Sequence, residues 1–305
     1  MANLKDIKSR IGSVENTKKI TRAMKMVAAA KVKKAEASVK ASRPFTQELL
    51  TLFRRTLAAV GEVSADGNKY ADSLDNFVGL LTHREVKTVG LILISSNKGL
   101  AGAYNANIVR AVNKKVKDYK SEGKNVVLYI VGQKGISAFR HNNEDVEVAK
   151  TYLAVANEPD ASGARLIAND VADDFISEKI DKIEIVTTRF NNMMSYAIQD
   201  WTVLPTKGVA ELEGHQETPE ALMEFVPSVE SILRNIVPMY VTNTIYQALL
   251  EASASELASR MTAMSAASNN AEEMIENLTI NYNKARQGAI TQELIEIVSG
   301  ANAQG

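Results

Sequence analysis

The pattern of apolar and polar positions predicts one long helix over residues 3 to about 56. Its first apolar residues follow the alternating three- and four-residue spacing of a coiled-coil seam. They are Leu4, Ile7, Ile11 and Val14. A narrow apolar stripe then continues among lysines at Ile20, Met24, Val27, Ala28, Ala29 and Ala30. This helix has too little apolar surface to form a domain core, and its small alanines permit close approach of another helix.

The middle of the chain has a different pattern. Residues 61–87 are polar and contain several glycines, as is typical of connecting structure. Apolar runs of strand length then alternate with segments of helical period. We expect strands over residues 86–95, 126–131, 182–188 and 196–204. We expect helices over residues 105–122 and 161–176, and a helical turn after Gly132. This alternation favours a small, mainly parallel, Rossmann-like α/β domain over residues 86–227.

A second long helix is predicted from Ser228, which follows Pro227 as a helix N-cap, to about Ser299. Pro238 is expected to bend this helix. From Leu257 onward, a series of positions is separated by steps of four and three residues in strict alternation. They are Leu257, Met261, Met264, Ser268, Ala271, Ile275, Leu278, Tyr282, Ala285 and Ala289. This spacing is a specific coiled-coil signal.

Together these patterns predict an α/β fold joined to a long antiparallel α-helical coiled coil. The N- and C-terminal helices, over residues 1–60 and 228–305, form the shaft. A connecting segment and the α/β domain lie between them, over residues 61–227. At ~1.5 Å per residue the helices reach about 80 Å and about 108 Å, so the second extends past the first by several turns. Those last turns need a partner outside this chain to bury Ile290, Leu294, Ile295, Ile297 and Val298.

Charge is distributed unevenly along the chain, although its net value is zero. Residues 1–56 contain 14 Lys and Arg against 4 Asp and Glu, residues 57–227 contain 18 against 24, and residues 228–305 contain 4 against 8. The resulting net charges of +10, −6 and −4 favour pairing of the two terminal helices. A basic N-terminal helix is also compatible with nucleic acid or an acidic membrane surface as its partner.

Few side chains are arranged for chemistry. The chain has no cysteine, and its three histidines lie apart, without a second ligand at helical spacing. Asp170, Asp173 and Asp174 share one predicted helix, where a solvated face is favoured over a metal site. No apolar run reaches the ~18 residues of a membrane span, and the N-terminus lacks an apolar signal core. We therefore predict no catalytic residue, no cofactor and no metal.

The loop over residues 95–105 follows a strand and opens a helix, where a phosphate-binding loop would lie in an α/β enzyme. It has neither the Gly-Lys-Ser/Thr ending of a P-loop nor the three-glycine dinucleotide pattern. A tight turn or a partner surface is therefore favoured. From the residues alone two other functions stay open: an α/β nucleotide-binding enzyme, and a basic coiled-coil adaptor that binds nucleic acid.

Two stretches at the ends of the chain are distinctive: LKDIKSRIGSVENTKKITRAMKMVAAAKVKKA near the N-terminus and YNKARQGAITQELIEIVSGA near the C-terminus. They resemble the opening helix and the closing signature of the gamma subunit of rotary, F-type ATP synthases. The stretch LLEASASELASRMTAMSAASNNA is similar to the preceding part of that family's last helix. The central segment agrees in order and length, so the resemblance covers essentially the whole chain.

The resemblance implies the central rotor stalk of an ATP synthase, a non-catalytic subunit. Such a stalk couples ion-driven rotation of the c ring to conformational cycling of the catalytic beta subunits, and in reverse it drives ion pumping. The implied partners are the alpha and beta subunits of the catalytic hexamer, the epsilon subunit and the c-subunit ring, and no nucleic acid. The implied location is that of a peripheral membrane protein at the cytoplasmic face of the bacterial plasma membrane, attached only through the complex.

The resemblance also implies contact and coupling residues, by their positions in the matching motifs. Met24, flanked by Arg22 and Lys25, corresponds to the contact with the moving lever of a beta subunit. Further coupling positions lie on the C-terminal helix at Arg260, Arg286, Gln287, Thr291, Glu293 and Glu296. Photosynthetic relatives carry a redox-active cysteine pair in an insertion before this helix. Here only 22 residues, none of them cysteine, separate Leu204 from Pro227, which indicates a bacterial type without that insertion.

Overall fold

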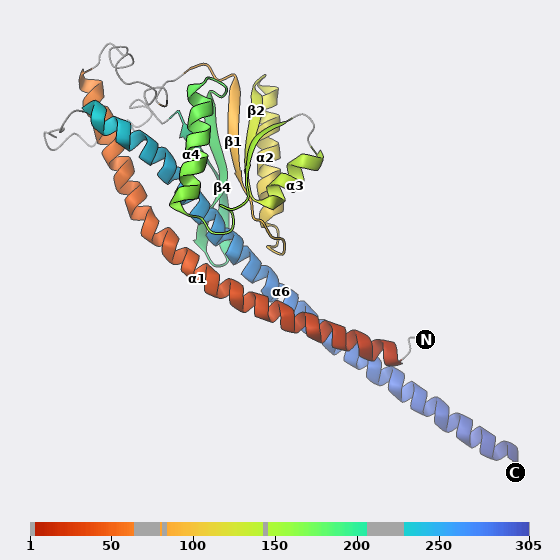
Figure 1. Ribbon diagram of the computed structural model, residues 1–305. Coiled ribbons are helices and arrows are strands. Elements are labelled where there is room, and N and C mark those ends of the chain that lie inside the picture. Colours follow the sequence, from red (N-terminus) through yellow and green to blue (C-terminus); the bar gives the residue numbers. More distant parts are fainter. Residues whose placement is uncertain (1–3, 64–79, 81–83, 143–145, 206–228, 305) are drawn as a thin grey trace. The chain divides into compact units, whose positions relative to one another are not determined.

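The computed structural model describes residues 4–63, 80, 84–142, 146–205 and 229–304 (Figure 1). The chain forms two compact units. The first combines Met1–Ala30 with Arg260–Gly305, and the second is Lys31–Ser259. Each unit is described by itself below.

Two long helices contribute to both units. Helix α1 spans Leu4–Val63, and helix α6 spans Val229–Gln304. Both were predicted from the sequence, and α6 is the longer, with 76 residues against 60. Helix α1 continues through Pro44 and α6 continues through Pro238, although each proline removes one helical hydrogen-bond donor. The predicted N-cap, Ser228, lies outside the described residues, and the bend at Pro238 stays a prediction.

A five-stranded sheet forms the centre of the second unit, in the order β3-β2-β1-β4-β5. The strands are β1 (Thr88–Ile94), β2 (Asn125–Val131), β3 (Glu147–Tyr152), β4 (Lys182–Asn192) and β5 (Ser195–Leu204). The first four in chain order are parallel, and β5 runs antiparallel to β4. The expected mainly parallel sheet is therefore confirmed, with one strand more than the sequence analysis predicted.

Helices cover both faces of this sheet (Figure 1). They are α2 (Tyr104–Ser121), α3 (Gln133–Asn142) and α4 (Ala161–Ile176). Side chains of β1 alternate between two cores, because successive residues of a strand point to opposite faces. Leu91 and Leu93 pack in the core that contains α2 and α3. Ile92 and Ile94 pack in the core that contains α4 and the second-unit parts of α1 and α6.

The strand missing from the prediction is β3. Its first five residues are exposed and only Tyr152 is buried, so it lacks the apolar run that marks the other parallel strands. It forms one edge of the sheet and hydrogen-bonds to β2 alone. An edge strand needs less apolar side-chain area than a central strand. The helix predicted over residues 161–176 has the same bounds as α4.

In the first unit, the predicted seam positions of α6 are the less exposed ones. Met264 and Ala271 are buried, and Met261, Ser268, Ile275, Leu278, Tyr282, Ala285 and Ala289 are half-buried. On α1, Ile7, Thr21 and Ala28 are buried, and Leu4, Ile11, Val14, Lys18 and Met24 are half-buried. The seam of α1 thus passes through Lys18 and Thr21, which the apolar pattern did not include.

The predicted stripe after residue 14 of α1 is therefore wrong at three positions, Ile20, Val27 and Ala30, which are exposed. Ile20 and Val27 are 60% and 58% exposed. Ile20 and Val27 lie one residue before the seam positions Thr21 and Ala28, so they point away from the seam. When a polar residue occupies a seam position, the alternating spacing of three and four residues predicts the seam better than the apolar pattern does.

This burial pattern predicts that an aspartate at Leu278 disrupts the first unit, because a charge would lie in the half-buried seam. We expect Leu278→Asp to destabilise the helix pair by about 1–3 kcal/mol. The matched control is Ile280→Asp, since Ile280 is two residues away on the same helix and 54% exposed. Urea unfolding followed by far-ultraviolet circular dichroism measures both. Equal unfolding midpoints for the two variants would contradict the seam assignment.

Candidate functional site at the paired helices and the sheet edge they cover

The residues implied by the family resemblance lie on the surfaces of α1 and α6 within the first unit. Met24 and Arg260 are half-buried. The others, Arg22, Lys25, Arg286, Gln287, Thr291, Glu293 and Glu296, are exposed. The structure does not gather them into one pocket. The side chains are spread along the surfaces of the two helices. This arrangement favours contact with another macromolecule over binding of a small substrate.

The basic group on α1 lies near an acidic side chain of α6. Lys18 forms a salt bridge of 2.8 Å with Glu272, between Nζ and Oε1. The hydrogen bond and charge of Lys18, followed by the charge of Arg22, lower the pKa of the Glu272 carboxyl from its ordinary value. Opposite charges on the two helices therefore face one another here, as the uneven charge distribution predicts.

The terminal group on α6 makes short-range contacts within its own helix. The Thr291 hydroxyl donates to the Gln287 carbonyl oxygen at 2.9 Å, and the Gln292 amide donates to the Glu296 carboxylate at 3.2 Å. The Thr291 oxygen keeps acceptor capacity for a partner. Around these polar residues lie the exposed aliphatic side chains of the last turns, which are 49–67% exposed: Ile290, Leu294, Ile295, Ile297 and Val298.

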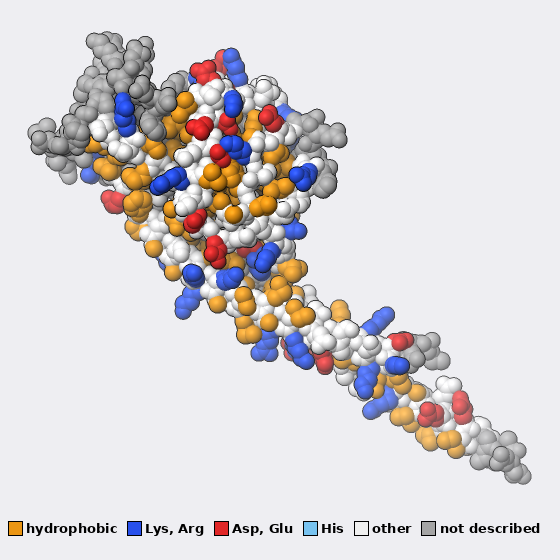
Figure 2. Space-filling view, viewed as in Figure 1, with side chains coloured by type: hydrophobic (Ala, Val, Ile, Leu, Met, Phe, Trp, Pro, Cys, Tyr) orange, Lys and Arg blue, Asp and Glu red, His pale blue; other side chains and the backbone are white. Residues whose placement is uncertain are grey.

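Figure 2 shows hydrophobic side chains at the surface of these last turns and of the helices generally. Several large aliphatic residues exposed within nine positions of a helix are more than the scattered exposed residues of an ordinary surface. The apolar pattern of the sequence predicted this feature. It favours a partner that covers the end of α6.

In the second unit, one buried carboxylate joins α1, α6 and β4. Glu251 on α6 is 0% exposed. It accepts hydrogen bonds from Arg43 Nε at 2.9 Å and Nη2 at 3.0 Å, from the backbone N–H of Phe190 at 2.8 Å and from the Gln247 amide at 3.0 Å. Arg43 also donates to the Phe190 carbonyl oxygen at 2.9 Å. We call these four residues the Arg43–Glu251 junction.

Sequence reasoning missed this junction, since a single glutamate among small and apolar residues carries no recognisable spacing. Its neighbours show that α1 and α6 run in opposite directions within the second unit. Thr46 contacts Asn243, and Phe53 stacks on Tyr240, with ring centroids 5.0 Å apart. Residues further toward the C-terminus of α1 thus contact residues further toward the N-terminus of α6.

Helix α6 also covers the carboxyl ends of β1 and β4, where open α/β sheets usually bind nucleotides. Thr187 on β4 donates to the Ala248 carbonyl oxygen at 3.2 Å, and Ser259 donates to the Ala101 carbonyl oxygen after β1 at 2.7 Å. Phe190 packs with Ala254 in a small apolar cluster. Residues of α6 therefore occupy the crevice at the point where the strand order reverses.

The loop over residues 95–105 contains turns, with Leu100 and Gly102 at positive φ, and its use as a partner surface stays a prediction. Backbone N–H groups of the loop and of the start of α2, which a phosphate would need, already have acceptors: Ser96 N–H donates to Asn105 Oδ1 at 3.0 Å, and Tyr104 N–H donates to the Ala101 carbonyl oxygen at 3.1 Å. Loop side chains also accept from the first backbone N–H groups of α3. Gln133 N–H donates to Asn97 at 2.9 Å, and Gly135 N–H donates to the Ser95 hydroxyl at 2.8 Å. Gly132 has φ +92°, and a Cβ there would lie 2.2 Å from the Ser95 carbonyl oxygen. This packing favours a structural turn over a nucleotide-binding loop.

The acidic group on α4 differs from the solvated face expected of it. Asp170 accepts hydrogen bonds from Tyr152 at 2.7 Å and from Lys150 at 2.6 Å. Asp174 accepts from Tyr129 at 2.7 Å and from Lys179 at 2.9 Å. Burial by itself raises the pKa of Asp174, but the bonds from Tyr129 and Lys179 outweigh burial and lower it. Two of the three aspartates thus attach α4 to the sheet and its surroundings.

Comparison with known proteins now decides the family. A family model described as ATP synthase matches residues 3–304. The ATP synthase gamma chain of Picosynechococcus sp. (strain ATCC 27264 / PCC 7002 / PR-6) is 40% identical over 326 aligned positions, which cover 99% of this chain and 100% of that protein. The gamma chain of Trichormus variabilis is also 40% identical, over 99% of each protein. The chain belongs to the ATP synthase gamma chain family.

Solved structures agree with this gamma-chain membership. The central stalk and c-ring structure of the Tetrahymena thermophila mitochondrial ATP synthase contains a chain that is 27% identical. It aligns with a TM-score of 0.56 over 82% of this chain and 99% of that one. A chain of the Euglena gracilis mitochondrial ATP synthase, 17% identical with a TM-score of 0.54, shares the fold. The chain therefore has the fold of a central stalk subunit, with an α/β domain and a helical shaft.

The alignments with the cyanobacterial gamma chains are longer than this chain, with 326 positions against 305 residues. Those relatives therefore carry segments that this chain lacks. This shorter length agrees with the expected absence of the photosynthetic insertion from this chain. In the described parts of the chain, no helix is long and apolar enough to cross a bilayer.

The Arg43–Glu251 junction gives a stability prediction. Arg43→Met is expected to destabilise the second unit by about 3–5 kcal/mol, because the Glu251 carboxylate would stay buried without its cation. Lys18→Met, which removes one partner of the solvent-accessible pair with Glu272 in the first unit, should leave the unfolding midpoint of the second unit nearly unchanged. Guanidinium unfolding followed by Trp201 fluorescence and by circular dichroism measures both. Similar midpoints for both variants would show that the junction is not a major source of stability.

Proposed function

We propose that this chain is the rotating central stalk of an ATP synthase, which transmits torque and makes no ATP itself. The observation that carries the proposal is the pairing of two long helices around a narrow seam, with exposed aliphatic turns at the end of the longer one. Membership of the gamma chain family, over nearly the full length, gives this shape its context. The chemistry of ATP synthesis is assigned to the beta subunits.

The shaft in this proposal is an antiparallel coiled coil of the N- and C-terminal helices. Three observations support it: the alternating three- and four-residue burial of α6, the matching seam of α1, and the Lys18–Glu272 salt bridge. If Lys18 lies opposite Glu272, the start of α1 at Leu4 lies opposite α6 near Arg286. The remaining turns of α6, about 27 Å of helix up to Gln304, then extend past their partner.

The proposed contacts with the catalytic hexamer are of two kinds. Arg22 and Lys25, beside Met24, present positive charge and a partly exposed thioether to acidic loops of the beta subunits. The end of α6 inserts its aliphatic side chains into an apolar sleeve formed by alpha and beta subunits. There Arg286, Gln287, Thr291, Glu293 and Glu296 donate or accept hydrogen bonds, and Arg260 does so nearer the domain. Charge and shape together favour this division.

The α/β domain is proposed to contact the epsilon subunit and, with the lower part of the coil, the c-subunit ring. In functional terms the chain then divides into residues 1–60, 61–227 and 228–305. Helix α6 fills the crevice at the carboxyl ends of β1 and β4, where a nucleotide would bind. This supports a domain that acts through contacts of its surface with partners. The proposed location is the cytoplasmic face of the bacterial plasma membrane, where the chain is held through the complex.

Truncation after Gly288 tests the role of the terminal turns. It removes the five aliphatic side chains that a partner would cover, Ile290, Leu294, Ile295, Ile297 and Val298, each worth about 1–2 kcal/mol before ordering costs. We expect weaker assembly and less ion pumping per ATP hydrolysed in reconstituted membranes, with residual ATPase activity. Truncation after Gly300 keeps all five side chains and is the control. Equal coupling in the two truncated complexes would rule out a role for these turns.

A single substitution separates mechanical transmission from catalysis. Glu293→Gln removes charge and keeps shape, so coupling should fall only modestly, since contact energy is spread over many residues. The same assay measures ATP-driven ion pumping beside ATP hydrolysis. Loss of hydrolysis as complete as that caused by removal of a catalytic base, with assembly intact, would be incompatible with a stalk.

A further inference from the structure

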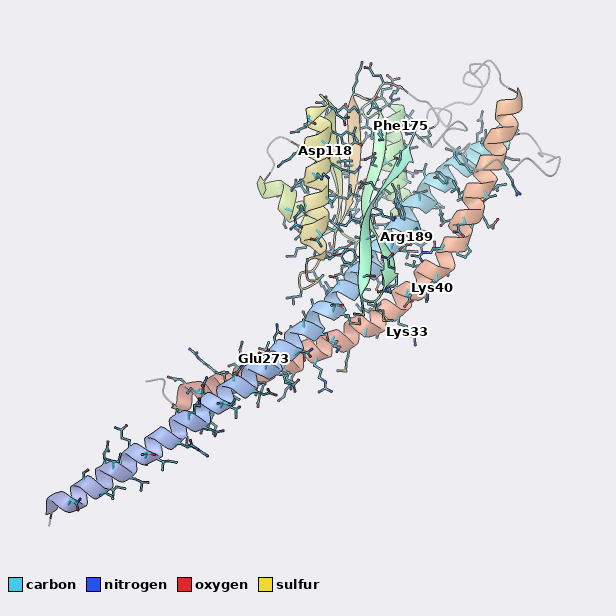
Figure 3. The ribbon with its side chains drawn as sticks, turned by 180° about the vertical axis from the view of Figure 1, so that it is seen from behind. Lys33, Lys40, Asp118, Phe175, Arg189 and Glu273 are labelled. Carbon is cyan, nitrogen blue, oxygen red and sulfur yellow. The ribbon has the colours of Figure 1, made fainter. Side chains whose placement is uncertain are left out.

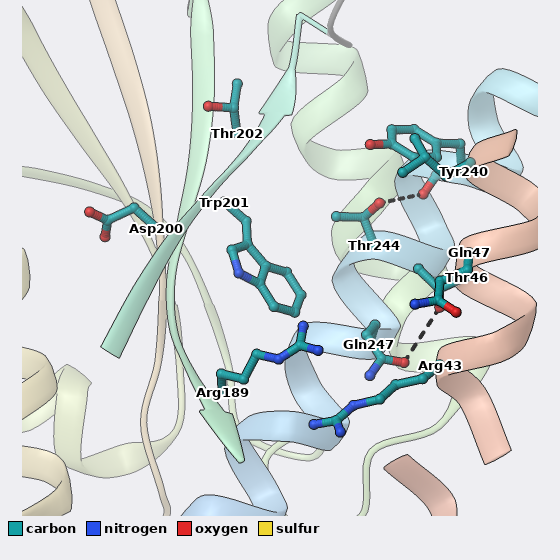
Figure 4. A pocket seen from close by; sticks show the side chains of 11 residues that line it. Arg43, Thr46, Gln47, Arg189, Asp200, Trp201, Thr202, Tyr240, Thr244 and Gln247 are labelled. Carbon is teal, nitrogen blue, oxygen red and sulfur yellow. Dashed lines mark hydrogen bonds between the residues drawn. The ribbon is translucent and has the colours of Figure 1, made fainter. Parts of the chain in front are cut away.

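The second unit contains a pocket of about 380 Å³ that the proposed stalk function does not use. It lies between the β4–β5 hairpin and the helices α1 and α6 (Figure 4). Its lining residues are Arg43, Thr46, Gln47, Leu50, Arg189, Asp200, Trp201, Thr202, Tyr240, Thr244 and Gln247. The volume is in the range of sites that hold small organic molecules.

Most polar side chains that the helices contribute to the pocket are already bonded within the chain. Arg43 and Gln247 both donate to Glu251. The Thr244 hydroxyl donates to the Tyr240 carbonyl oxygen at 2.8 Å. These groups have little remaining capacity for a ligand, so they form a wall of the pocket and do not determine what it binds.

Arg189 is different. It follows Thr187 by two residues on β4, so both side chains point to the sheet face that α1 and α6 cover. The guanidinium is half-buried in the pocket, and within the described ranges no hydrogen bond or ion pair links it to another residue. Figures 3 and 4 show Arg189 at the end of β4 with its side chain toward the helices.

The acidic residue of the pocket lining does not neutralise Arg189. Asp200 neighbours Trp201 on β5 and points to the opposite face of the sheet (Figure 4). Its carboxylate pairs with Lys115 on α2 at 3.2 Å. Since Arg43 is paired with Glu251, the pocket carries the single positive charge of Arg189.

An aromatic surface lies next to that charge. The indole of Trp201 is half-buried and points into the pocket, and its N–H donates to Gln199 at 3.1 Å (Figure 4). Leu50 and Tyr240 add apolar area on the helix side. A planar group has a stacking surface here, with a forked donor beside it.

We propose that this pocket binds a small molecule that carries an oxyanion, a carboxylate or a phosphate, on a planar apolar body. The guanidinium of Arg189 takes the oxyanion through two parallel hydrogen bonds, and the ring of Trp201 takes the body. The volume favours such a molecule over a single acidic side chain, which would leave much of the space empty. The inference does not depend on rotation of the chain within a complex.

Trp201 makes the test direct, because it is the only tryptophan of the chain. The purified full-length chain is titrated with benzoate, phenyl phosphate, inorganic phosphate and the neutral benzamide at constant ionic strength, while indole fluorescence is recorded. We expect a saturable change with benzoate or phenyl phosphate at about 1 mM or below. Benzamide and inorganic phosphate should bind at least about tenfold more weakly, since each lacks one of the two recognised groups. The stronger of the two aromatic acids identifies the oxyanion.

Substitutions of Arg189 test whether its guanidinium binds the oxyanion. Arg189→Gln should weaken binding of the aromatic acid about tenfold or more, and Arg189→Lys should weaken it less, because lysine keeps the charge but not the fork. Arg165→Gln removes an exposed arginine of α4 and should leave binding unchanged. Circular dichroism measures whether each variant is folded. If Arg189→Gln does not fold, the role of the Arg189 charge is tested by Arg189→Lys and by the comparison of the aromatic acid with benzamide.

Three results would overturn the proposal. The first is no saturable change with either aromatic acid. The second is equal binding of benzoate and benzamide. The third is equal binding by the wild-type chain and a folded Arg189→Gln variant. If the first result comes with a Trp201 signal that responds to an acidic peptide, the pocket is a protein contact.

Discussion

A helix whose apolar surface is a narrow stripe gains too little from burial to be stable alone in water. Both α1 and α6 are of this kind in the first unit, where seam positions are buried or half-buried and most of the residues between them are exposed. Each helix is therefore ordered by the other. The alanines that permit close approach and the opposite charges at Lys18 and Glu272 follow from that one requirement.

In the second unit the same two helices pack against a sheet, and this changes what the α/β fold can do. The strand order places a crevice at the carboxyl ends of β1 and β4, where many proteins with such sheets hold a nucleotide. Here α6 enters that position, and its Glu251 accepts the Phe190 backbone N–H at the end of β4. A fold common among nucleotide-binding enzymes thus serves as an attachment for helices, since function depends on what occupies the site.

The elements with strong periodic patterns were predictable from the sequence, and the exceptions have physical causes. Strand β3 lies at an exposed edge of the sheet and therefore has no apolar run. The apolar pattern that marks buried strands could not predict it. Ile20 is apolar but lies outside the seam, because Thr21 takes the seam position. The candidate contact residues came from resemblance to a family. Arg43 and Glu251 meet across 208 residues of sequence, and no local pattern reveals such a pair.

The pairing of distant segments has a consequence for how the chain is made. Lys18 and Glu272 are separated by 254 residues, so α1 leaves the ribosome long before its partner exists. At ~5–20 residues per second, synthesis of the intervening chain takes roughly 10–50 seconds. During that interval the nascent N-terminal segment exposes its apolar stripe, and its net charge of +10 over residues 1–56 opposes self-association. The basic composition of this segment therefore protects it during synthesis as well as matching it to an acidic partner helix.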